Sequence, residues 1–133
     1  MGGDGNDTIT AGGGRDLLFG GRGADALRGG SGDDLLVAGP SAYDASLAAL
    51  RAIWDEWTRM DAAYPTRVRH LRGTSSGGRN AGYYLTPSTV SDDAAVDLLF
   101  GESGNDWFFY RSSGGSKDVL DRKRCEEVTL IDP

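Results

Sequence analysis

An aspartate recurs every nine residues at the start of the chain, on a background rich in glycine. The aspartates are Asp7, Asp16, Asp25 and Asp34. A large apolar residue stands two positions after each of them, at Ile9, Leu18, Leu27 and Leu36. A glycine stands two positions before each, at Gly5, Gly14, Gly23 and Gly32. Such a fixed period constrains the architecture more than any other feature, because each unit must pack against its copies.

The repeating unit reads G-G-x-G-x-D-x-U-x, where U is a large apolar residue. Its glycine half tolerates positive φ and close backbone approach, which indicates a tight turn with exposed carbonyl groups. Its x-U-x half indicates a three-residue strand whose central side chain points to one face. Stacked turns would line each edge with carbonyl and carboxylate oxygens, and calcium takes about six to eight such donors. A flexible linker of similar composition would not keep the apolar residue in phase.

This nonapeptide resembles the calcium-binding repeat of the RTX (repeats-in-toxin, haemolysin-type) family. The resemblance implies a parallel β-roll, in which successive nonapeptides alternate between two sheets and one coil takes about eighteen residues. It also implies a secreted, extracellular protein exported by type I secretion machinery. Scarce cysteine accompanies that route in the family, and Cys125 is the single cysteine of this chain.

The repeat stops at Pro40 and returns near Asp97. Residues 97–100 match D-x-U-x behind a degraded turn, residues 101–109 form a good copy of the unit, and residues 113–121 form a weaker one. We therefore expect a mainly β fold with an α insertion, that is, a parallel β-roll of nonapeptide repeats interrupted by a helical subdomain. The expected parts are the N-terminal half of the roll (1–39), the inserted helical and loop subdomain (40–91), and the C-terminal half of the roll with an end cap (92–133).

The metal ligands that we expect are aspartate carboxylates completed by carbonyl groups of the glycine turns. The carboxylates are those of Asp7, Asp16, Asp25, Asp34, Asp97 and Asp106. The glycines are Gly3, Gly5, Gly12, Gly14, Gly21, Gly23, Gly30, Gly32 and Gly104. Only turns one full coil apart stack on the same edge, so the expected pairs are Asp7 with Asp25, Asp16 with Asp34, Asp25 with Asp97, and Asp34 with Asp106. This arrangement predicts about three to five calcium ions.

The interrupting segment has an apolar stripe at helical spacing. It consists of Leu47, Leu50, Ile53, Trp54 and Trp57. The stripe predicts an amphipathic helix over about residues 43–62, with Ser41 and Asp44 as a capping box at its start. A second short helix is expected over residues 67–72, with Thr66 as its N-cap.

Outward-facing strand residues indicate where this segment packs. In the even-numbered repeats the side chains on either side of the inward apolar residue are themselves apolar, at Leu17, Phe19, Leu35 and Val37. A sheet face of this kind is too apolar to remain in water. We expect the inserted helix to cover it, with Trp54 or Trp57 in contact with Phe19, Val37 or Trp107. The competing interpretation is that this face binds a partner.

Composition narrows the function classes. The formal net charge is −6 and the pI is near 4.6, so nucleic acid is not an expected partner. No apolar run approaches the roughly 20 residues of a membrane span. Residues 73–77 match G-x-S-x-G, but a Ser/Gly loop surrounds them where a nucleophile elbow needs a strand and a helix. The lone His70 is expected on a helix surface, and we expect no enzyme.

Two function classes remain. The first is a calcium-binding, calcium-dependent folding module, monomeric, that assists export and stabilises or caps a larger secreted protein. The second is an extracellular adhesion or ligand-binding module that uses the aromatic residues of the insert. Burial of Trp54, Trp57, Tyr83 and Tyr84 against the roll would favour the first class, and their exposure would favour the second.

Overall fold

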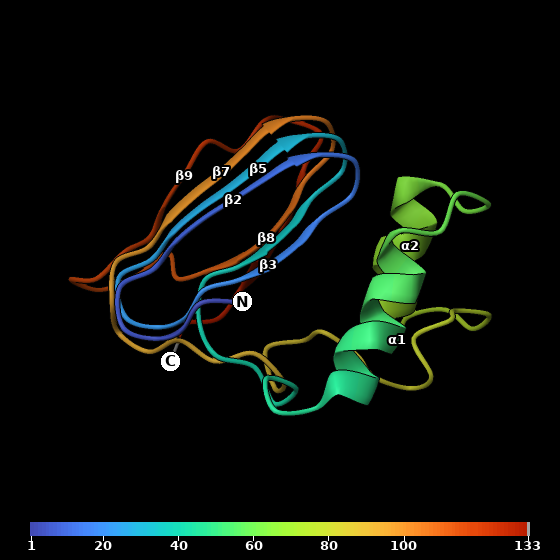
Figure 1. Cartoon of the computed structure of the whole chain (residues 1–133), viewed down its shortest axis with the longest axis horizontal. Helices are drawn as coiled ribbons and strands as arrows, with labels where there is room; N and C mark the ends of the chain where they lie inside the picture. Colours follow the sequence, from blue (N-terminus) through green and yellow to red (C-terminus); the bar gives the residue numbers. More distant parts are fainter. Residues whose placement is uncertain (133) are drawn as a thin grey trace.

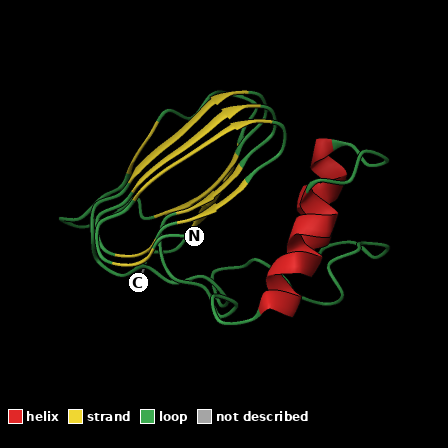
Figure 2. Cartoon of the chain, viewed as in Figure 1, coloured by secondary structure: helices red, strands yellow, loops and turns green. Residues whose placement is uncertain are grey.

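Two four-stranded parallel β-sheets face each other in the computed structural model, which describes residues 1–132 (Figures 1 and 2). The first sheet has the order β2 (Thr8–Gly13), β5 (Ala26–Ser31), β7 (Leu98–Ser103), β9 (Val119–Leu120). The second sheet has the order β3 (Leu17–Phe19), β6 (Leu35–Val37), β8 (Trp107–Tyr110), β10 (Glu127–Leu130). A short parallel pair, β1 (Gly3–Asp4) and β4 (Gly21–Arg22), aligns two turns. Repeat strands alternate between the sheets, so the fold is the expected β-roll with a helical insertion.

The coils of the roll remain in register across the interruption. Leu27 of β5 pairs on one side with Ile9, which lies in the same repeat position one coil earlier. On its other side Leu27 pairs with Leu99, beyond the insert. In the second sheet Leu36 likewise pairs with Phe108. The roll is therefore continuous, and the long segment between β6 and β7 replaces a single turn.

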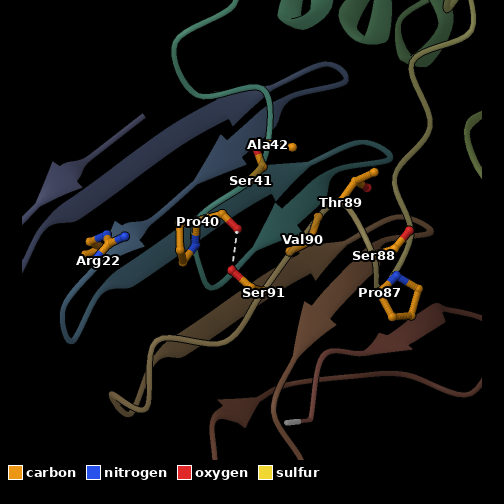
Figure 3. A pocket seen from close by; sticks show the side chains of 9 residues that line it. All are labelled: Arg22, Pro40, Ser41, Ala42, Pro87, Ser88, Thr89, Val90 and Ser91. Atoms are coloured by element: carbon orange, nitrogen blue, oxygen red, sulfur yellow. Dashed lines mark hydrogen bonds between the residues drawn. The ribbon is translucent and has the colours of Figure 1, made fainter.

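The segment between β6 and β7, which we call the insert, leaves and rejoins the roll at one narrow neck. Ser41 and Val90 form an antiparallel bridge, and the Ser91 amide donates a hydrogen bond to the Pro40 carbonyl at 3.0 Å. Figure 3 shows Pro40 and Ser91 facing each other at this point. A Cβ at position 39 would collide with the Ser91 carbonyl, so Gly39 allows the two chain segments to meet. Because the ends are paired, the insert does not separate the coils.

The first inserted helix, α1 (Leu47–Trp57), is shorter than the sequence predicts. Its N-cap is Ser46, whose side chain accepts a hydrogen bond from the Ala49 amide at 3.3 Å. The expected capping box is wrong, because Ser41 and Asp44 bond each other in the turn that precedes the helix. Ser46 satisfies an orphan amide at the helix start, which is the usual role of a serine there.

The second inserted helix, α2 (Tyr64–Leu71), begins earlier than predicted. Pro65 lies in its first turn, where the missing amide hydrogen has no partner to lose, and Thr66 is inside the helix rather than at its N-cap.

Packing against α1 buries His70, whose Nδ1 lies 2.6 Å from Oε1 of the buried Glu56, so the expectation of a surface histidine is wrong. Within residues 1–132, neither helix has the length and apolar character that a membrane crossing requires.

The helices lie beside the second sheet and cover its outer face (Figure 1). The outward side chains of this sheet are buried, including Phe19, Leu35, Val37, Trp107 and Phe109. Trp57 is 0 % exposed and its ring centroid lies 6.1 Å from that of Trp107, which confirms the expected contact. Trp54 instead is 51 % exposed and faces away from the core. Insert and roll share one hydrophobic core.

Two carboxylates close the C-terminal end of the roll. Asp121 accepts hydrogen bonds from the amides of Gly101 and Glu102 at 2.8 and 3.0 Å. Asp132 accepts from the Ser112 amide at 2.8 Å and from the Ser112 hydroxyl at 2.9 Å. These carboxylates accept hydrogen bonds from backbone amides that would otherwise donate to a further coil. At the same end of the roll, β10 is the edge strand of the second sheet.

Candidate metal centre

The repeat aspartates form two columns, one along each edge of the roll. The Asp7 column contains Asp7, Asp25, Asp97 and Asp118, and the Asp16 column contains Asp16, Asp34 and Asp106. Within a column, Oδ1 of each aspartate accepts a hydrogen bond from the backbone amide of the aspartate one coil earlier, at 2.7–2.9 Å. The structure thus brings together all four aspartate pairs expected from the sequence and adds Asp118.

The second carboxylate oxygen is unpartnered in most of these aspartates. Oδ2 of Asp7, Asp25, Asp34 and Asp106 is buried without a hydrogen-bond partner within residues 1–132. Each of these oxygens points at the first glycine of its own turn, because a Cβ at Gly2, Gly20, Gly29 or Gly101 would collide with it. A buried carboxylate oxygen without a donor is costly in free energy. A cation is the natural partner for such an oxygen.

The glycine turns stack so closely that carbonyl groups of one coil face the next. A Cβ at Gly32 would collide with the Gly14 carbonyl oxygen, and one at Gly104 would collide with the Gly32 carbonyl oxygen. The same relation links Gly21 to Gly3, Gly23 to Gly5, and Gly30 to Gly12. Gly32 also has φ 124°, a conformation that side chains rarely adopt. All the glycines predicted as carbonyl donors therefore lie in these turns, beside the aspartate columns.

Burial raises the pKa of Asp25, Asp34, Asp97 and Asp106, and neighbouring carboxylates raise it further. The pKa of Asp34 is about 6, chiefly through burial and then through the nearby Asp16 carboxylate. The pKa values of Asp97 and Asp106 are about 7, again chiefly through burial and then through adjacent carboxylates. Burial also raises the pKa of Asp25. A divalent cation at these positions would favour the ionised forms and reverse the shifts.

The interrupted turn still presents a carboxylate to the Asp7 column. Asp93, at the returning end of the insert, accepts a hydrogen bond from the Gly23 amide. In an uninterrupted turn the equivalent amide, that of Gly14, donates to the Ser31 carbonyl of the next coil at 2.8 Å. Asp93 therefore replaces a backbone carbonyl beside Asp25. Sequence reasoning missed this role because the turn before β7 has lost its glycines.

The insert binds the Asp16 column directly. Arg67 is buried, pairs with the Asp33 carboxylate and lies over the Trp57 ring at 4.8 Å from its centroid. Trp57 Nε1 donates a hydrogen bond to the Asp33 carbonyl at 3.0 Å. The Tyr64 hydroxyl donates to the Asp106 carbonyl at 2.7 Å. The helices therefore hold backbone groups at, or next to, two of the stacked aspartates.

The donor set fits calcium. Within residues 1–132, no three His, Cys, Asp or Glu side chains converge on a single point. The columns contribute one carboxylate per coil, so an ion between coils would take most of its ligands from turn carbonyls. Oxygen donors of this kind suit a hard cation with a flexible coordination shell, whereas zinc sites use nitrogen and sulfur ligands in a tetrahedron.

Comparison with protein families and known proteins gives the following result. A family model described as the RTX calcium-binding nonapeptide repeat, in four copies, matches residues 1–36 and 89–112. The matched segments contain all six aspartates that the sequence predicts as ligands. Most of the insert lies outside the match, as do Asp118 and the closing strand. No curated protein and no solved structure gives a significant match to the chain.

Proposed function

Because the repeats of this chain belong to the RTX calcium-binding nonapeptide family, we propose that the chain is a module that folds when it binds calcium. The proposal rests mainly on the four buried Oδ2 atoms in the aspartate columns that have no hydrogen-bond donor. Without a cation, stacking these carboxylates costs desolvation and repulsion, which the unfolded chain avoids. Calcium then supplies free energy that exists only in the folded roll.

The proposed ligands are the carboxylates predicted from the sequence, with carbonyl groups of the glycine turns beside them. The Asp7 column contributes Asp7, Asp25 and Asp97, and the Asp16 column contributes Asp16, Asp34 and Asp106. With ions between neighbouring coils, about three to five calcium ions bind. We also propose the division into residues 1–39, 40–91 and 92–133, of which Pro133 lies outside the described residues.

The biological role that we propose is in a larger secreted protein. An expanded, calcium-free roll suits export through type I secretion machinery, and folding follows where calcium is abundant. Extracellular calcium modules work with dissociation constants of about 10⁻⁴–10⁻³ M. The folded roll, monomeric and closed at its C-terminal end by Asp121 and Asp132, then stabilises or caps the protein to which it belongs. No chemistry is assigned to the module itself.

Calcium titration of the chelator-treated chain tests the folding proposal. We expect the far-ultraviolet β signal to rise and the hydrodynamic radius to fall together in one cooperative transition. Magnesium at the same concentrations is the control, since it is smaller, prefers octahedral geometry and dehydrates reluctantly. An unchanged β signal and an unchanged radius in chelator would refute calcium-dependent folding.

A specific observation keeps the adhesion function as a second candidate. Trp54 on α1 is 51 % exposed, and Leu47 on the same helix and Tyr84 elsewhere in the insert are exposed as well. Trp57, the other tryptophan of the helix, is fully buried and belongs to the core. The adhesion function predicts that Trp54→Ala abolishes attachment to a surface while leaving the calcium midpoint unchanged. Retained attachment in that variant would remove this candidate.

A further inference from the structure

The last coil has a glutamate where the other coils have an aspartate. β10 pairs with β8 so that Glu127 lies opposite Trp107, which places Glu126 opposite Asp106. The Glu127 amide donates to the Asp106 carbonyl at 3.0 Å, as the Trp107 amide donates to the Asp34 carbonyl at 2.8 Å one coil earlier. Glu126 therefore extends the Asp16 column by one coil, although its turn contains no glycine and lies outside the match to the repeat family.

Glu126 and Asp106 face each other with unpartnered oxygens. Glu126 is 4 % exposed and Asp106 is 0 % exposed. The strand register makes the two residues neighbours in adjacent coils, and Glu126 is one of the groups that raise the pKa of Asp106, yet Oε1 of Glu126 and Oδ2 of Asp106 have no hydrogen-bond donor within residues 1–132. The remaining oxygens are already used: Oδ1 of Asp106 accepts from the Asp34 amide, and Oε2 of Glu126 accepts from the Lys123 amide. Each of these two neighbouring carboxylates therefore has a buried acceptor oxygen without a hydrogen-bond donor.

The Lys123 side chain forms an ion pair with Glu126 but neutralises only part of the charge of the two carboxylates. Its Nζ lies 3.7 Å from Oε1 of Glu126, which is too long for a hydrogen bond. The lysine side chain is also half exposed, and one ammonium faces two buried carboxylates. A hard divalent cation would match both charges and accept oxygen ligands from both side chains.

We propose that Asp106 and Glu126 hold a calcium ion that binds the closing strand β10 to the rest of the roll. This inference rests on the proposed function, in that calcium is the cation. It adds a site in which one ligand comes from outside the nonapeptide repeats. The Tyr64 hydroxyl, which donates to the Asp106 carbonyl, also accepts from the Glu127 amide at 3.1 Å. The site therefore joins three segments: the turn before β8, the closing strand and helix α2.

The test compares Glu126→Gln with Glu127→Gln. Glu127 is the neighbouring glutamate, and its half-exposed carboxylate pairs with Arg72 at 3.1 Å. Calcium bound per chain is counted by atomic emission at the end of equilibrium dialysis against saturating calcium, and the calcium midpoint of folding is measured by circular dichroism. Glu126→Gln should retain one ion fewer than the wild type, and the affinity of the lost site should fall at least about tenfold. Glu127→Gln should retain the full number.

The direction of the midpoint shift separates a metal ligand from a repelling pair. If Glu126 only repels Asp106, Glu126→Gln removes the repulsion, so the midpoint falls and the ion count stays unchanged, which overturns the proposal. Lys123→Gln gives a second readout if Glu126→Gln fails to fold. Removing an ammonium that competes with calcium should lower the midpoint, whereas a raised midpoint would identify Lys123 as the counter-ion and overturn the site. A wild-type chain that binds no calcium would instead refute the proposed function.

Discussion

Replacing Trp57 by alanine should detach the insert from the roll. The Trp57 side chain is fully buried at the junction of the two parts. Its ring packs against Tyr64 and Trp107, with centroids 5.8 and 6.1 Å away. Its Nε1 donates to the Asp33 carbonyl at 3.0 Å, and the buried Arg67 lies over its face. One substitution therefore removes apolar packing, a hydrogen bond and a cation–π contact together.

The cost can be estimated from these contacts. Truncating a buried tryptophan to alanine costs roughly 3–5 kcal/mol. The lost hydrogen bond to Asp33 adds about 0.5–1.5 kcal/mol, and Arg67 stays buried without the nearer of its two aromatic partners. We expect a loss of at least about 3.5 kcal/mol in the free energy of unfolding. A small domain has about 5–15 kcal/mol in total, so the variant should need more calcium to fold.

Urea unfolding at saturating calcium, followed by circular dichroism, measures this loss. Trp54→Ala is the matched control, because it removes the same side chain three residues earlier in α1 from a half-exposed position. We expect the control to cost less than about 1 kcal/mol, as is usual away from the core. Equal losses in the two variants, or a loss below about 1.5 kcal/mol for Trp57→Ala, would refute the docking of the insert through Trp57.

Three further variants and conditions test the turns, the columns and the end cap. Gly32→Ala should cost at least about 1–3 kcal/mol in urea unfolding through left-handed strain alone, whereas Gly115→Ala, whose Cβ meets nothing within 4 Å, should be near neutral. Calcium binding should weaken from about pH 8 to pH 6. Burial and then Glu126 raise the pKa of Asp106 to about 7 in the calcium-free fold, above about 3.9 in the unfolded chain. The calcium-free fold therefore binds more protons than the unfolded chain between these values and loses stability as pH rises through them, so any β signal that remains in chelator should fall as pH rises toward about 7; a β signal in chelator that does not depend on pH would contradict this. Asp121→Ala should speed hydrogen exchange of the Gly101 amide and cost about 0.5–2 kcal/mol, as a lost helix cap does.

The repeat architecture could be predicted because its period is visible in the sequence. Nine-residue spacing places Asp7 and Asp25 one coil apart, and the structure pairs them as expected. The expected contact of the inserted helix with Trp107 is also found, through Trp57. Helix details were less predictable: Trp54 and Trp57 lie on one helical stripe, and only the position of the second sheet decides which of them is buried. His70 is buried by packing against α1, which no local pattern indicates.

The candidate site was predictable where the motif is complete and not elsewhere. The repeat aspartates followed directly from the unit, but the role of the first glycine of each turn, such as Gly101, depends on where the Asp106 carboxylate points. Asp93 and Glu126 stand in turns without glycine, so the motif does not reveal their register. Both positions become clear only from strand pairing across long separations in sequence.

The position of the insert links helix docking to calcium binding. A long insertion at a turn costs little by itself, since loop-closure entropy grows only with the logarithm of length. Here the insert also contacts the Asp16 column, through Arg67 and Trp57 on Asp33 and through Tyr64 on the Asp106 carbonyl. These contacts hold the same turns that an ion between Asp34 and Asp106 requires. A ligand that favours one arrangement of these turns stabilises whatever else requires that arrangement, and the effect is reciprocal. Calcium in this column should therefore tighten docking of the helices, and docked helices should raise calcium affinity in this column more than in the Asp7 column.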